Sequence, residues 1–158
     1  MTIQEFANHV AVSPFEVVSL AYSRMDNPRL EEGDLLQYSG GNCPEKASFL
    51  QQSQGLWEAI LVYSFKAKRL RKAKADAPKL EDACFSLDVS LRSLLKCDCD
   101  VSVTEELQNE ILKDFLPSLA KPYFFSLVTE AVVKAGLPTL KMNVFVGSEV
   151  KKRKKEAK

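Results

Sequence analysis

Two stretches that alternate between apolar and polar residues constrain the fold of this chain more than any other feature. In residues 57–67, and more strictly in residues 85–92, every second position is apolar. A period of two predicts strands with one buried and one wet face, as antiparallel sheets have. The basic segment between them, residues 68–79, is expected to form a long exposed hairpin loop. Leu94 and Leu95 break the alternation, which predicts a bulge or a strand end there.

Weaker patterns predict elements in the N-terminal third. Thr2 and Glu5 have the spacing of a capping box, which predicts a helix over residues 2–10. Residues 15–23 are rich in β-prone side chains and predict a strand. Residues 26–48 contain several Gly and Pro and predict a loop, in which a short paired segment around residues 35–38 is possible.

The C-terminal half predicts two helices. The first covers residues 104–116 and is interrupted by Pro117, and the second covers residues 118–135 and ends at Gly136. The second helix is apolar around more of its circumference than one sheet-packing face needs. We therefore expect it to pack on the sheet and also on a partner subunit. The candidate interface residues are Leu127, Val128, Ala131, Val132 and Ala135.

The chain offers little material for catalysis or metal binding. Its single histidine, His9, has no cysteine or acid at a ligand-like or triad-like spacing, so a solvated surface position is the preferred interpretation. Cys97 and Cys99 are the only close cysteine pair, whereas a structural zinc site needs four ligands. The sequence has no glycine-rich phosphate-binding motif and no nucleophile elbow. An enzyme, a cofactor and a metal are therefore not expected.

The sequence also indicates the cellular compartment of the protein and the classes of partner that its charge allows. No apolar run is long enough for a membrane span, the first residues do not resemble a signal peptide, and four scattered cysteines do not form a disulfide framework, which favours the cytoplasm. The net charge is +1, but basic residues cluster at 66–79 and 151–158. These clusters leave a nucleic-acid-binding regulatory module as an alternative, although they lack interleaved aromatic residues. A plain structural subunit of an oligomer is a third possibility.

A specific pattern of prolines, glycine and aromatic residues extends from residue 117 to residue 145. Two prolines five residues apart are followed directly by an aromatic residue, then a helical threonine, a closing glycine and proline, a leucine and an Asn-x-aromatic pair: Pro117, Pro122, Tyr123, Thr129, Gly136, Pro138, Leu140, Asn143 and Phe145. This pattern resembles the SecB family of export chaperones. The likeness is fairly specific over residues 111–145 and only topological over residues 55–103.

The resemblance implies an α+β fold with a four-stranded antiparallel sheet and a long C-terminal helix packed on it. Residues 1–147 would form one SecB-like domain, and residues 148–158 a basic, disordered tail. SecB-like proteins use no cofactor and no ATP, perform no reaction, assemble as a dimer of dimers and hold unfolded polypeptides in hydrophobic grooves. The resemblance implies one of two roles: a general export chaperone that hands clients to a translocation motor, or a chaperone dedicated to one antitoxin of a toxin–antitoxin pair.

Charge favours the antitoxin role, because export-type members are acidic and this chain is neutral with a basic end. The glycine and proline are also spaced one residue closer than in the family pattern. The candidate groove residues are apolar positions on the predicted strands and helix, for each of which ordinary core packing is the alternative: Val17, Leu20, Tyr22, Trp57, Tyr63, Phe65, Phe124, Phe125 and Phe145.

Overall fold

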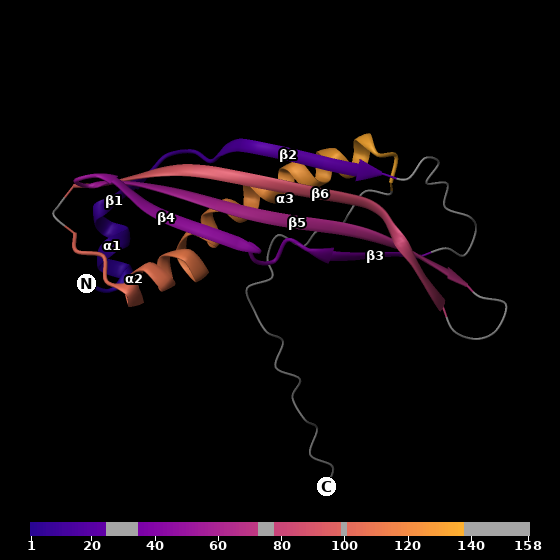
Figure 1. The fold of residues 1–158 in the computed structure, drawn as a ribbon, viewed down its shortest axis with the longest axis horizontal. Helices are drawn as coiled ribbons and strands as arrows, with labels where there is room; N and C mark the ends of the chain where they lie inside the picture. The colour runs from indigo at the N-terminus through magenta and orange to yellow at the C-terminus, as the bar shows by residue number, and fades with distance from the viewer. Residues whose placement is uncertain (25–34, 73–77, 99–100, 138–158) are drawn as a thin grey trace, which may run out of the picture.

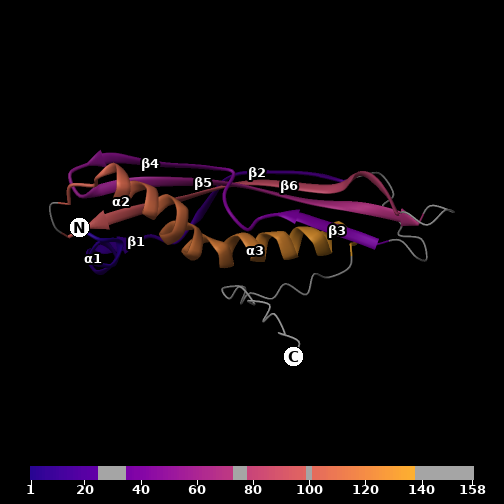
Figure 2. The same cartoon turned by 90° about the horizontal axis from the view of Figure 1, so that it is seen from below.

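An antiparallel sheet with helices on one face makes up the part of the chain that the computed structural model describes, residues 1–24, 35–72, 78–98 and 101–137 (Figures 1 and 2). Strands and helices follow one another in the order α1 (Ile3–His9), β1 (Val10–Val12), β2 (Glu16–Arg24), β3 (Leu35–Gly40), β4 (Lys46–Ser53), β5 (Leu56–Lys72), β6 (Pro78–Cys97), α2 (Glu105–Glu110), the π-helical turn η1 (Ile111–Phe115) and α3 (Leu116–Lys134). The predicted tail 148–158 lies outside the described residues.

The hairpin of β5 and β6 forms the centre of the sheet. The two strands pair antiparallel from Leu56↔Lys96 to Lys72↔Pro78, so most of the predicted loop 68–79 is strand. The predicted break at Leu94 and Leu95 is also wrong, since β6 continues to Cys97. Leu95 is wholly buried and Leu94 is exposed, so the two leucines simply occupy opposite faces.

Each edge of the sheet is built from two strand segments. β1 and β2 pair with successive parts of β6, while β4 and β3 pair with successive parts of β5. The six segments therefore form a sheet four strands wide, in agreement with the predicted α+β architecture. The prediction missed β4, part of which it had assigned to a loop.

The helical half is more continuous than predicted. α2, η1 and α3 follow one another directly, and Pro117 lies in the first turn of α3, where a missing N–H is tolerated. The prediction that Pro117 separates two helices is therefore wrong, because helical residues continue on both sides of it. The end of α3 is as predicted: Gly136 has φ 71° and its N–H bonds to the carbonyl of Val133 at 3.0 Å.

The N-terminal helix is held by its cap and one aromatic contact. Thr2 and Glu5 form the predicted capping box. Phe6 is wholly buried and meets the ring of Phe115 edge-on, with centroids 6.0 Å apart. At the other end of α1, Nδ1 of His9 lies 3.0 Å from a carboxylate oxygen of Asp98, just past β6. These contacts fix α1 against the ends of β6 and η1.

Candidate functional site

An apolar groove lies between the edge strand β2 and helix α3. The register pairs Val17, Leu20 and Tyr22 with inward residues of β6, so all three project from the face that α3 covers. Although they lie on this face, Leu20 and Tyr22 stay 51% and 68% exposed. Isolated apolar side chains on a surface are ordinary, whereas a contiguous exposed set marks an interaction site.

The groove has a volume of about 560 Å³. Its walls combine apolar side chains of β2, β6 and α3 with a short polar rim: Leu20, Tyr22, Ser23, Arg24, Leu87, Leu127, Glu130, Ala131, Lys134 and Ala135. On the rim, Nζ of Lys134 lies 2.6 Å from a carboxylate oxygen of Glu130, and Nη1 of Arg24 donates to the carbonyl of Ala135 at 3.4 Å. The groove can therefore accept an apolar polypeptide segment, and the polar side chains of its rim can contact the backbone of that segment.

Three of the seven aromatic residues predicted to line a groove lie in the core instead. Tyr63, Phe65 and Phe124 are buried, and the rings of Tyr63 and Phe124 stack with centroids 4.7 Å apart. Phe125 is half-buried, with Nζ of Lys121 5.5 Å from its ring centroid. Trp57 is half-buried and stacks on Phe49. Phe145 lies outside the described residues.

Tyr63 carries the one buried side-chain polar atom that has no hydrogen-bond partner within the described part of the chain. Its side chain is 1% exposed. Burial raises the pKa of this hydroxyl to about 12, and the nearby Cys43 thiol contributes in the same direction. A buried hydroxyl without a partner costs free energy, so this position favours a phenyl ring over a phenol.

The helix residues predicted to form an interface divide into two groups. Val128 and Val132 are buried against the sheet of their own chain, whereas Leu127 and Ala131, which are half-buried, and Ala135, which is buried, line the groove. A different set is exposed on α3: Leu119, Tyr123 and Val133. With Ser126 and Glu130 they follow a helical repeat of three to four residues, so they share one side of the helix. The sequence shows this spacing, but it does not show that these side chains are exposed.

Other chemistry is sparse in the described residues. They contain no group of three or more His, Cys, Asp or Glu side chains arranged to hold a metal ion. Cys97 is buried on the inward face of β6, as an alternating strand position predicts, and Cys99 is outside the described residues. His9 is half exposed and pairs with Asp98 on the surface. None of the helices in these regions has the length and apolarity that a bilayer crossing requires.

Comparison with known proteins finds similarity to solved structures only. No protein-family model matches the chain, and no curated protein matches it. Among solved structures, a SecB-like chaperone of Mycobacterium tuberculosis in complex with a ChAD peptide from the HigA1 antitoxin is similar, with a TM-score of 0.60 at 10% identity. The likeness covers 88% of this chain and 93% of the other. The chain thus has the fold of the SecB-like chaperones.

Proposed function

We propose that this protein is a SecB-type chaperone that binds an aggregation-prone polypeptide without ATP. The observation that carries the proposal is the open apolar groove between β2 and α3. Its walls come from regular elements, so it exists before a client arrives, and its apolar character suits unfolded segments of varied sequence. Among the described residues β2 pairs only with β6, so its other edge is available to pair with an extended client backbone while alternate client side chains enter the groove.

We further propose an antitoxin as the client rather than proteins destined for export. The similar mycobacterial structure contains an antitoxin peptide, which supports this choice. The near-neutral charge of the chain also supports it, because an export-type SecB chaperone is expected to have an acidic surface for hand-over to a translocation motor, and this chain has a net charge of +1. Binding through an apolar groove should show a negative heat-capacity change and weak salt dependence. Binding of nucleic acid would instead weaken steeply as salt rises.

The groove is tested with the double variant Leu20→Ser/Tyr22→Ser. Both side chains are more than half exposed, so the fold should persist. Removing two apolar contacts should weaken binding of an unfolded client peptide by roughly tenfold or more, at about 25 cal/mol per Å² of lost apolar contact. Affinity is measured by fluorescence anisotropy with a labelled antitoxin-derived peptide, and aggregation of the antitoxin is followed by light scattering.

Val18→Ser is the matched control, because Val18 lies on the same strand, is about equally exposed and does not line the groove. It should bind the peptide as the parent protein does. Unchanged affinity in the double variant, together with a lower mass in solution, would show that a second copy of the chain occupies the groove and that the client binds elsewhere.

A further inference from the structure

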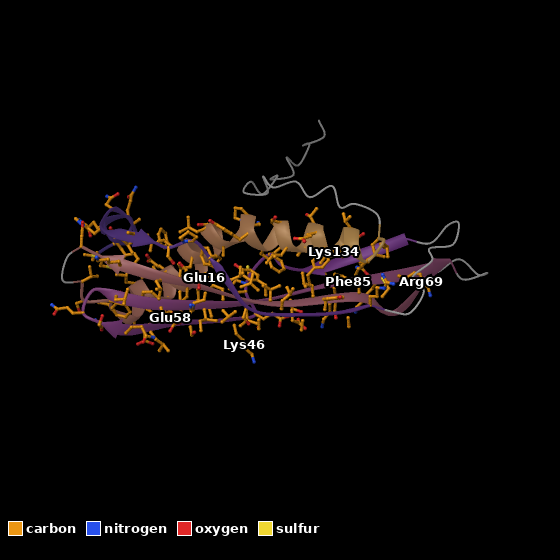
Figure 3. All side chains as sticks on the ribbon, turned by 90° about the horizontal axis from the view of Figure 1, so that it is seen from above. Glu16, Lys46, Glu58, Arg69, Phe85 and Lys134 are labelled. Carbon is orange, nitrogen blue, oxygen red and sulfur yellow. The ribbon has the colours of Figure 1, made fainter. Side chains whose placement is uncertain are left out.

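Among the described side chains, basic ones outnumber acidic ones on the face of the sheet opposite α3. The positions that alternate with the buried ones on β5 and β6 point to this outer face, as do their partners on β2 and β4. Figure 3 shows Lys46 projecting from the sheet on the side away from α3. Five basic residues have outward positions: Lys46, Lys66, Lys68, Arg92 and Lys96.

Two of the acids on this face are paired with the same cation, Arg92. Arg92 lies 2.8 Å from a carboxylate oxygen of Glu16 and 3.7 Å from one of Glu58, so one cation holds two acids. Asp88 is a further outward acid of β6 and takes part in none of the ion pairs among the described side chains. The four lysines take part in none of the ion pairs that the described residues form. They are therefore free to meet anions from outside.

The shape of this face suits an extended chain. Outward positions between the lysines are held by short side chains such as Ser19, Ser86 and Ser90. Two leucines are exposed on the same face, Leu50 at 59% and Leu94 at 40%, on either side of Glu58. Lys66 and the partner of Lys46, Val62, are four residues apart on β5, or roughly 13 Å at the rise of a strand. An extended polypeptide with carboxylates about four residues apart matches that spacing.

We infer that the outer face of the sheet docks an acidic segment of the polypeptide client, in addition to the apolar contacts in the groove. The inference rests on the proposed function, since it takes the ligand to be a polypeptide client. The charge of the face selects the ligand: carboxylates of the client pair with Lys46 and Lys66, and apolar client side chains cover Leu50 or Leu94. Clients with an acidic flank are then preferred over neutral ones of equal apolarity.

The experiment compares two labelled unfolded peptides of equal length and apolar content. One carries four Asp or Glu residues in a flank, and the other carries Gln or Asn at the same places. At about 50 mM salt the acidic peptide should bind roughly tenfold more tightly, and the advantage should fall below about twofold near 500 mM. Lys46→Glu/Lys66→Glu should abolish the advantage and leave the affinity for the neutral peptide unchanged.

Lys113→Glu is compared with Lys66→Glu, because both change the net charge equally and Lys113 lies on η1, outside the sheet. Only Lys66→Glu should reduce the advantage of the acidic peptide. An equal loss in both variants, or no advantage in the parent protein, overturns the inference. So does displacement of the acidic peptide by a DNA oligonucleotide of equal charge with equal potency, which indicates a general polyanion surface. Failure of the neutral peptide to bind would instead contradict the groove proposal.

Discussion

At the scale of single residues, Tyr63 gives the clearest test of the core. Its pKa of about 12 in the folded chain exceeds the value near 10 of an unfolded chain. Between these pH values the unfolded chain loses a proton that the folded chain keeps, so stability falls as pH rises. We expect urea unfolding to show a loss of roughly 1 to 2 kcal/mol between pH 9 and 11 that Tyr63→Phe does not show.

The same variant reports on the hydroxyl at neutral pH. Below pH 9 both folded and unfolded chains keep the phenol protonated, so ionisation contributes nothing to the difference. Tyr63→Phe should then be as stable as the parent protein or more so, because it removes a buried polar atom without a partner. A loss of more than about 1 kcal/mol would mean that the hydroxyl has a hydrogen-bond partner, such as a bound water.

At the scale of elements, the passage from β3 to β4 depends on a close approach to α3. Gly41 has φ 80°, and a Cβ placed on it would lie 2.6 Å from a ring carbon of Phe124. Gly41→Ala should therefore cost roughly 2 to 4 kcal/mol, combining the positive φ with overpacking. Gly136→Ala is the matched control: φ is 71° and no atom lies within 4 Å, so only about 1 kcal/mol should be lost. Urea midpoints measure both, and equal losses would rule out the contact with Phe124.

The elements also show what the sequence could and could not predict. Strict alternation identified β5 and β6, because both strands have one buried and one wet face. Strand β4 was missed because its inward positions include Ala47 and Gln51 beside Phe49, which is too weak a pattern to separate strand from loop. The helix end at Gly136 was predictable from local chemistry, whereas no local pattern specified the π-helical turn that directly precedes α3 and Pro117.

The candidate site was only half predictable for a related reason. Leu20 on β2 and Tyr63 on β5 both belong to apolar faces that point toward α3. One is exposed and the other buried, because β2 is at the edge of the sheet and β5 is in the middle. Strand order decides exposure, and it depends on pairings between residues distant in sequence. The sequence could therefore name apolar faces without telling the groove from the core.

At the scale of the whole molecule, the exposed stripe on α3 predicts self-association. Leu119, Tyr123 and Val133 give one side of the helix apolar surface that the sheet does not cover. We propose that this side packs against a second copy, and light scattering should give a mass above that of one chain. Val133→Lys should lower the mass, whereas Leu50→Lys, equally exposed but on the sheet, should not. A parent protein that is monomeric at micromolar concentration would contradict this.

The pairing of β2 with β6 imposes an order on synthesis. Leu20 pairs with Val89, roughly 70 residues later, and translation proceeds at about 5 to 20 residues per second. Strand β2, with its apolar side chains, is therefore made several seconds before its partner exists, while the β5–β6 hairpin can close as soon as both arms emerge. Until then the nascent chain exposes the same kind of unpaired apolar strand that aggregation-prone clients expose. Until β6 has been made, the nascent chain of this proposed chaperone is therefore itself prone to aggregate through β2.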